Sequence, residues 1–283
     1  VQKLIRDIII HADERSYTTV GKKTLVAEFD RNFAEDIGIA VCGEFDEDDT
    51  YSFDYYLPYL RSDLVSTAED ISIERHAAKE SYAGICDDPK VGVSLIFYLQ
   101  NMISYLKLQG EGKIPAKGTS LNLSALSCQG TIMMPIQKTE WQKKKIAKDA
   151  VQRNRLIQAA RGGDEEAMES LTLEDMDTYT SISRKIQKAD IFSFVDTYFM
   201  PYGVECDQYS VIGEIEEVEK IRNIYTKEEI YRMKIESHDL EFVVCINSKD
   251  LLGEPQPGRR FKGQIWMQGT LKLEDIIRKQ GIK

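Results

Sequence analysis

Apolar and polar residues alternate in four segments near the C-terminal end of the chain: Tyr209–Glu219, Glu228–Glu236, Leu240–Ile246 and Arg260–Leu273. This alternation places every second side chain on the same face of a β-strand, so one face can enter a core. The first strand is long, the next two follow closely, and the fourth returns after a short connection at Asn247–Leu252. The pattern predicts a small β-barrel that occupies residues 196–283.

The returning strand of this predicted barrel carries its most distinctive side chains. One face, which we expect to be core, consists of Phe261, Ile265 and Met267. The opposite face and its flank consist of Arg259, Arg260, Lys262, Gln264, Trp266 and Gln268. This mixture is similar to that of oligonucleotide-binding (OB) barrels, which stack bases on aromatic rings and contact phosphates with basic residues. The two arginines, Lys262 and Trp266 are therefore candidate binding residues.

The same face has two other interpretations. It could contact a protein, or Trp266 could simply pack against the first part of the chain, because barrels of this shape serve many unrelated functions. The charge balance also disfavours nucleic acid: the chain has 37 basic and 47 acidic residues, a net charge of -10. Residues 201–283 alone contain 13 Lys plus Arg and 15 Asp plus Glu. Barrels that bind nucleic acid usually carry a basic stripe, so this role is an alternative only.

The residues before the barrel mix helical and strand patterns. A short helix is expected at Leu4–Ala12, followed by strands at Thr24–Phe29, Ile37–Phe45, Tyr51–Tyr59, Ser81–Cys86, Thr119–Leu126 and Thr131–Ile136. The longest apolar run, Val91–Leu108, predicts a buried central helix, and its polar interruptions argue against a membrane span. The fold class is therefore α+β: a domain at residues 1–195, with a mixed sheet, the central helix and a helical segment, precedes the OB-like barrel.

The net charge of the helical segment, residues 139–190, changes sign along the sequence. Glu140–Arg161 has a balance of +5, and residues 164–178 have a balance of -7. Gly162-Gly163-Asp164 predicts the end of one helix and the cap of the next, and Thr172 resembles the start of a third. Antiparallel helices with opposed charges explain the pattern, while Lys143, Lys144 and Lys145 are the candidate contacts if the segment instead binds a protein or RNA.

Motifs for catalysis are absent from the sequence: we find no nucleophile elbow, P-loop, dinucleotide fingerprint or metal-ligand spacing. The one chemically varied cluster contains His76, Cys86 and Asp87, which would suit thiolate catalysis if the fold brought them together. The alternative is an ordinary histidine, a buried thiol and a polar residue near a helix start. We predict no cofactor and no metal, and we lean against an enzyme.

The five cysteines are scattered and form no C-x-x-C pair, as expected for reduced thiols in a cytoplasmic protein. No signal peptide is visible after Val1, and no membrane association is expected.

Three stretches carry a resemblance to a known family: residues 72–101 (SIERHAAKESYAGICDDPKVGVSLIFYLQN), 196–215 (DTYFMPYGVECDQYSVIGEI) and 250–269 (DLLGEPQPGRRFKGQIWMQG). They resemble uncharacterised proteins of Gram-positive anaerobic bacteria that share a domain of unknown function. The resemblance covers nearly the whole chain and implies a bacterial cytoplasmic protein, but it implies no catalytic residue.

The leading functional hypothesis from the sequence is a non-catalytic protein that binds a protein partner. Single-stranded nucleic-acid binding by the barrel is the first alternative, and an enzyme that uses the His76 and Cys86 region is the second.

Overall fold

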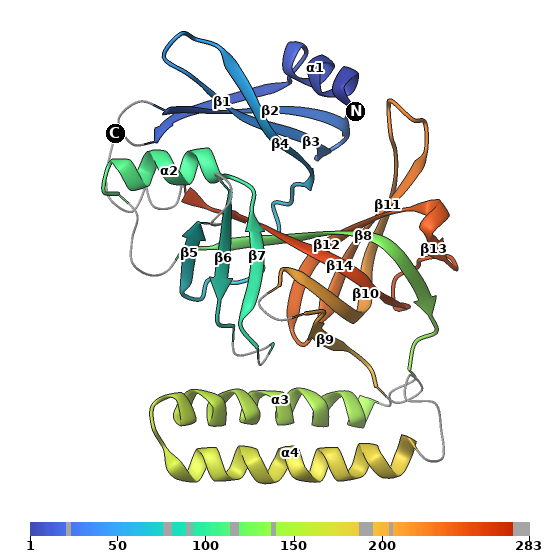
Figure 1. The fold of residues 1–283 in the computed structure, drawn as a ribbon. Helices are drawn as coiled ribbons and strands as arrows, with labels where there is room; N and C mark the ends of the chain where they lie inside the picture. The colour runs from blue at the N-terminus through green and yellow to red at the C-terminus, as the bar shows by residue number, and fades with distance from the viewer. Residues whose placement is uncertain are drawn as a thin grey trace.

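The structure is a computed structural model of the chain (Figure 1). It describes residues 1–20, 24–75, 81–88, 91, 93–113, 119–136, 140–186, 195–203 and 206–273. The fold is mixed α+β, as predicted, and it consists mostly of sheet. No helix within these ranges is both long and apolar enough to cross a membrane.

The N-terminal residues form a separate antiparallel sheet with one helix on it. Its elements are α1 (Gln2–Ile10), β1 (Glu14–Val20), β2 (Thr24–Ala34), β3 (Ile37–Phe45) and β4 (Tyr51–Leu60). The strands pair in chain order. The helix α1 lies on this sheet because Ile8 packs among Phe29, Phe33 and Val41. The predicted helix and the three predicted strands of this region are therefore present.

A second, larger sheet contains a closed barrel. Its strands are β5 (Ile71–Arg75), β6 (Tyr82–Cys86), β7 (Leu95–Leu99), β8 (Leu121–Met133), β9 (Tyr198–Pro201), β10 (Gln208–Arg222), β11 (Glu229–Ser237), β12 (Leu240–Asn247), β13 (Leu251–Leu252) and β14 (Arg260–Leu271). Five of them close in the order β8-β12-β11-β10-β14 and back to β8. The pair β12–β8 is parallel, and the other four pairs are antiparallel.

The barrel contains a strand that the sequence interpretation placed elsewhere. All four strands predicted between residues 209 and 273 are present, but residues 196–283 do not close the barrel alone. The closing strand β8 comes from the first part of the chain, and the two strands predicted there are one continuous strand. Strand partners are selected by packing across the sheet rather than by nearness in sequence, so alternation could not reveal this pairing.

Two further expectations for the N-terminal part are wrong. Its strands do not form one mixed sheet, because β1–β4 stand apart while β5–β8 join the barrel sheet. The apolar run at residues 91–108 is not one central helix: it forms β7 and then the shorter α2 (Met102–Gly110). A continuous apolar run suits a buried strand as well as a helix. In β7 the residues Leu95, Phe97 and Leu99 are fully buried, which is the period of a strand.

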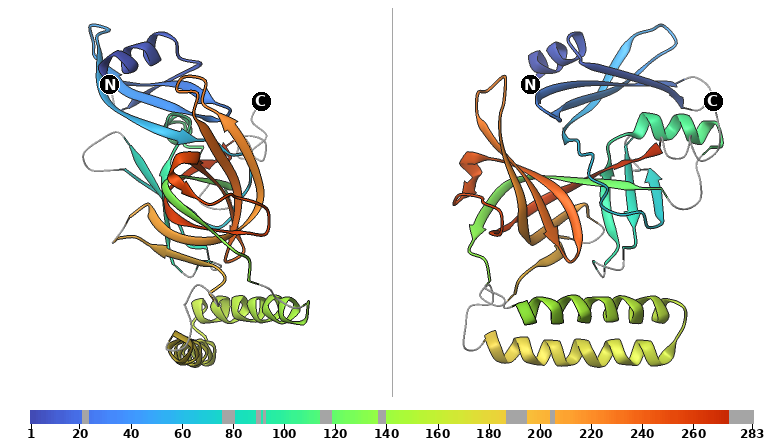
Figure 2. Two further views of the ribbon diagram at one scale, coloured as in Figure 1. Left: turned by 90° about the vertical axis from the view of Figure 1, so that its right-hand side faces the viewer. Right: turned by 180° about the vertical axis from the view of Figure 1, so that it is seen from behind.

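The charged segment forms a helical hairpin, α3 (Glu140–Arg161) and α4 (Glu165–Ile186). Arg153 pairs with Asp175 at 2.8 Å, so the opposed charges face each other as predicted. Asp164 caps α4 by accepting from the Ala167 amide. Thr172 lies inside α4 and donates to the Met168 carbonyl, so the expected third helix start is wrong. The hairpin lies at the end of the molecule opposite β1–β4 (Figures 1 and 2).

Candidate functional site

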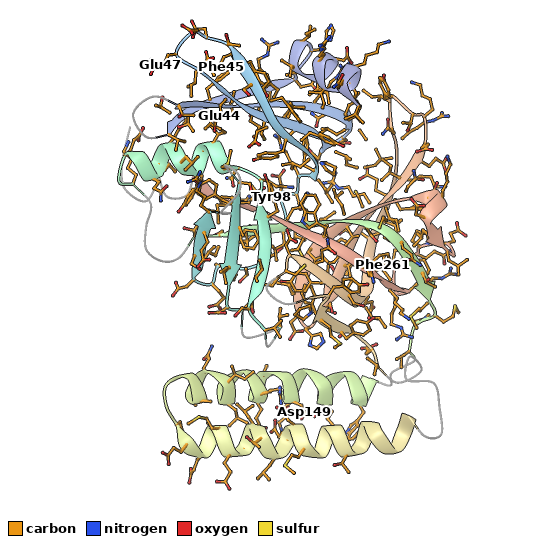
Figure 3. The ribbon with its side chains drawn as sticks, viewed as in Figure 1. Glu44, Phe45, Glu47, Tyr98, Asp149 and Phe261 are labelled. Atoms are coloured by element: carbon orange, nitrogen blue, oxygen red, sulfur yellow. The ribbon has the colours of Figure 1, made fainter. Side chains whose placement is uncertain are left out.

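The first sheet meets the barrel sheet along a row of aromatic side chains that we call the seam: Tyr55, Tyr98 and Trp266. The hydroxyls of Tyr55 and Tyr98 are 3.3 Å apart, and the Tyr98 and Trp266 ring centroids are 5.6 Å apart. Figure 3 labels Tyr98 in the region where the two sheets come together. The Trp266 indole donates to Asp207 Oδ2 at 2.6 Å. The seam therefore joins the two sheets through contacts that are both apolar and polar.

The buried side-chain amide of Gln268 links the two sheets close to the seam and to a cavity. Gln268 is 0% exposed, and its oxygen accepts from the Leu60 backbone at 3.1 Å and from Gln100 Nε2 at 2.7 Å. Its nitrogen donates to the Pro58 carbonyl at 2.8 Å. Because Pro58 and Leu60 belong to β4, these bonds attach the last strand of the first sheet to β14. They also fix Gln100, which lines the cavity.

The cavity has a volume of about 520 Å³ and lies between the two sheets. Its walls come from β1, β2, the residues just after β4, the start of α2, β8 and the end of β14. A smaller adjoining space shares Glu28, Asp30, Arg61 and Gln100 and leads toward Tyr98 in the seam. Elements distant in the sequence therefore combine to build a polar pocket, which is a common setting for a ligand site.

Two carboxyl groups of β2 dominate the electrostatics of this cavity. Burial, and to a smaller extent the nearby negative charge of Asp30, together raise the pKa of Glu28 to about 8. Burial also raises the pKa of Asp30 to about 6, although Arg61 beside it acts in the opposite direction. Arg61 pairs with Asp30 and, at 2.9 Å, with Glu14. Paired acids with raised pKa values are more frequent at functional sites than elsewhere.

The Cys42 thiol supports Glu28 from the neighbouring strand β3. Cys42 Sγ donates to Glu28 Oε2 at 3.6 Å. Burial raises the pKa of Cys42, and the Glu28 carboxylate adds to the effect, so this sulfur stays a thiol. It acts here as a weak donor to Glu28 rather than as a nucleophile.

Two buried oxygen atoms at the cavity accept no hydrogen bond from any residue that the structure describes. They are Asp30 Oδ1 and Asn122 Oδ1, and both residues are 4% exposed. Asn122 Nδ2 donates to the Ser62 carbonyl at 2.8 Å, which fixes the orientation of the amide. Leaving such an acceptor unsatisfied costs roughly 1–3 kcal/mol. Other atoms of both residues line the cavity, so the two oxygens lie directly behind its wall.

The residues predicted on the returning strand do not make one exposed face. Arg260 is 4% exposed and donates to the carbonyls of Met134 at 3.0 Å and Val195 at 2.7 Å. These two carbonyls lie where the chain leaves the barrel sheet for the hairpin and where it returns. Trp266 is partly buried in the seam, while Arg259 donates to the Glu254 carbonyl and Lys262 is half-buried. The structure places Trp266 in the packing between the two sheets, which was one of the interpretations of this residue.

The other predicted residues are spread over the molecule. Lys144 and Lys145 are exposed on α3, and Lys145 Nζ lies 5.6 Å from the Trp141 ring centroid. Lys143 belongs to α3, but its side chain lies outside the described part. His76 also lies outside the described residues, so its position relative to Cys86 is not part of the structure.

The thiol predicted to act with His76 is deeply buried. Cys86 is 0% exposed, and burial raises its pKa to about 12, which keeps it protonated. Asp87 accepts from the Ser94 hydroxyl. Across the described ranges, no three His, Cys, Asp or Glu side chains gather as a potential metal site.

Sequence reasoning missed Glu28 and Asp30. The available signal was their spacing: they are two residues apart on a strand, on the same face as Val26, which is 1% exposed. Acids on the apolar face of a strand indicate a buried polar site. The spacing could not show that Arg61, Gln100 and Asn122 would meet them.

Fold and cavity together define a class: an α+β protein in which a closed five-stranded barrel is joined to a second sheet over a carboxylate-lined pocket. Residues 1–269 match the family described as "Domain of unknown function, E. rectale Gene description (DUF3881)". The chain belongs to this family, which confirms the predicted membership in a family of unknown function. No curated protein and no solved structure matches the chain.

Proposed function

We propose that this protein binds a small polar molecule in the cavity between its two sheets. The observation that carries the proposal is that Asp30 and Asn122, which both line one cavity, each hold a buried oxygen with no hydrogen-bond partner among the residues that the structure describes. Native proteins satisfy nearly all buried polar atoms, and exceptions call for a functional or solvent partner. A ligand with hydrogen-bond donors recovers the free energy that both oxygens forfeit in the empty protein.

The cavity also has the composition of a polar ligand site. Amides, hydroxyls, carboxylates and an arginine converge on it, while Tyr59 and Tyr98 line the adjoining small space. Gln100 is held by Gln268 and by Thr270 Oγ1, which donates to Gln100 Oε1 at 2.7 Å. A side chain fixed in this way is ready to bind without further ordering, which favours affinity.

The proposal is tested by blocking the mouth of the cavity. Ser104 lines the cavity from the exposed side of α2, whereas Gln109 is exposed on the same helix and does not line it. We expect a screen of small amines, amides, polyols and carboxylic acids by ligand-observed NMR to give binders. Ser104→Tyr should abolish their binding, and Gln109→Tyr should preserve it. An empty screen, or binders that ignore Ser104→Tyr, would overturn the proposal.

Protein binding through the helical hairpin is a second candidate, favoured by exposed apolar side chains. Leu173 is 57% exposed and Met176 is 62% exposed on α4, close to acidic residues such as Glu169. Large apolar side chains gathered on a charged helix are typical of a contact surface. The chemistry that complements this side of α4 is a helix with apolar and basic side chains.

A pull-down from host lysate tests the second candidate, with half of the sample treated with nuclease. The double variant Leu173→Glu and Met176→Glu should lose a protein that the unmodified chain retains after nuclease. The matched control is Leu252→Glu, which changes an exposed leucine of β13, outside the hairpin. Equal recovery by all three proteins would count against the hairpin, and recovery that nuclease abolishes would point to nucleic acid instead.

We further propose that the barrel is of the OB type. The support is its strand order: β10, β11 and β12 form a meander, β14 returns, and the closing strand β8 pairs parallel with β12. In OB barrels the second and third strands form the ligand face. Here that face has its bases already paired, Arg232 with Asp36 and Lys234 with Glu216 and Glu241. This charge pattern supports the cavity over the barrel face as the binding site.

A further inference from the structure

We propose that the ligand of the cavity is an organic cation, an amine or a guanidinium compound, whose charge is balanced by Glu28. This inference rests on the proposed binding function and names its ligand class. The unsatisfied atoms are both acceptors, so the ligand must present donors. Ammonium and guanidinium groups carry several donors and accept none, which matches the two oxygen atoms.

The charges around the cavity favour a cation over an anion. Four carboxyl groups line it, against two basic side chains, Arg61 and Lys272. Arg61 is already bonded to Asp30 and Glu14, so its charge is largely compensated inside the protein. Even with Glu28 protonated, the other three carboxyl groups outnumber the two bases, so an anionic ligand would meet repulsion at short range in a partly buried site.

Glu28 supplies the balancing charge by losing its proton when the cation binds. It faces Asp30 on its own strand, Glu14 on β1, Cys42 on β3, Arg61 after β4 and Tyr98 on β7. In the empty cavity, burial and Asp30 hold Glu28 protonated near neutral pH. A bound cation favours the carboxylate form, so one proton leaves the Glu28 carboxyl for solvent as the ion pair forms. A neutral polar ligand would satisfy the oxygens without releasing this proton.

Isothermal titration calorimetry with matched probes tests the inference. The probes are butylamine, butanol and butyrate, which share a carbon chain and differ in charge, together with methylguanidine and its neutral counterpart methylurea. We expect butylamine and methylguanidine to bind at least about tenfold more tightly than their neutral counterparts, because charge-assisted hydrogen bonds are stronger. Their affinities should rise with pH, by up to about tenfold per pH unit while Glu28 is protonated in the free protein.

Two variants separate the role of Glu28 from general effects. Glu28→Gln should weaken cation binding and remove most of its pH dependence. Glu44→Gln changes a half-buried glutamate on β3 that does not line the cavity (Figure 3) and should leave both unchanged.

Failure of this inference differs from failure of the proposed function. Equal binding of charged and neutral probes, or cation binding that Glu28→Gln leaves intact, overturns the cation assignment and leaves a polar site. If no cation binds while the NMR screen still gives binders that Ser104→Tyr abolishes, the ligand class alone is wrong. If the screen is also empty, both proposals fall.

Discussion

At the scale of single residues, the protein keeps ionisable and polar groups in positions where their solvation is poor. Glu28 is the clearest case, because its pKa rises from 4.5 to about 8 when burial disfavours the carboxylate. Between pH 4.5 and about 8, the folded protein therefore retains a proton on Glu28 that the unfolded chain has released. The contribution of Glu28 to the free energy of unfolding is therefore fully present below pH 4.5 and is lost as pH rises toward 8.

Glu28→Gln should remove this pH dependence, since glutamine cannot ionise. At about pH 8 the variant is expected to be more stable than the unmodified protein by on the order of 2 kcal/mol, and at about pH 4 the two should be similar. Urea unfolding at both pH values measures the difference. Parallel stability curves for the two proteins would show that Glu28 is ionised in the fold.

Gln268 is a second residue whose polar atoms matter more than its size. Gln268→Leu retains the volume but leaves the Leu60 amide and the Pro58 carbonyl without their partner. We expect a loss of roughly 2–4 kcal/mol in the free energy of unfolding, because two buried groups become unsatisfied. Gln264→Leu, at an exposed position of the same strand, is the control and should change little. A similar small effect of both substitutions would mean that the first sheet is held by apolar contacts alone.

At the scale of elements, the hairpin of α3 and α4 is an insertion between β8 and β9 that is anchored at its base. Arg260 donates to one carbonyl on each connecting segment, at Met134 and at Val195. One guanidinium group therefore holds both ends of the insertion, a role that its position in the sequence did not reveal. Burial lowers the pKa of Arg260, which reflects the cost of placing this charge there.

Arg260→Met should release the base of the hairpin, because the carbonyls of Met134 and Val195 lose their donor. The expected loss is about 2 kcal/mol of stability, with faster amide hydrogen exchange at the ends of β8 and β9 that adjoin the hairpin. Arg259→Met is the matched control, because the side chain of the neighbouring Arg259 donates to the nearby Glu254 carbonyl and is half-buried. Unchanged exchange in Arg260→Met would exclude the anchoring role.

At the scale of the whole molecule, the two sheets share the seam while the hairpin lies apart from them (Figure 1). The chain has two tryptophans, and they report on different parts. Trp266 lies in the seam, whereas Trp141 is 69% exposed on α3. Tryptophan emission can therefore follow the joined sheets and the hairpin separately.

Single-tryptophan variants should show two unfolding transitions. With Trp141→Phe, the emission of Trp266 is expected to change together with the sheet signal in circular dichroism. With Trp266→Phe, the emission of Trp141 is expected to change at lower urea, because α3 and α4 pack on each other and helices without further packing are marginally stable. Coincident transitions in both variants would instead indicate one cooperative unit.

Local physics in the sequence determined many of the elements. Alternation located the barrel strands β10, β11, β12 and β14, because a strand with one buried face must repeat every two residues. The Gly162-Gly163-Asp164 turn located the hairpin, because glycine ends a helix and aspartate caps the next. The charge reversal across this turn likewise indicated the pairing of α3 with α4.

Tertiary structure alone decided how these elements meet. β8 closes the barrel by pairing with β12 and β14, which lie more than a hundred residues away in the sequence. No local pattern encodes a pairing over that distance. The run containing Leu95 became a strand rather than a helix because β6 and β14 were there to pair with it. The carboxyl groups of Glu28 and Asp30 became a candidate site only when Arg61, Asn122 and Gln100 were packed around them. Their raised pKa values come from burial, and burial is a property of the folded molecule rather than of any segment.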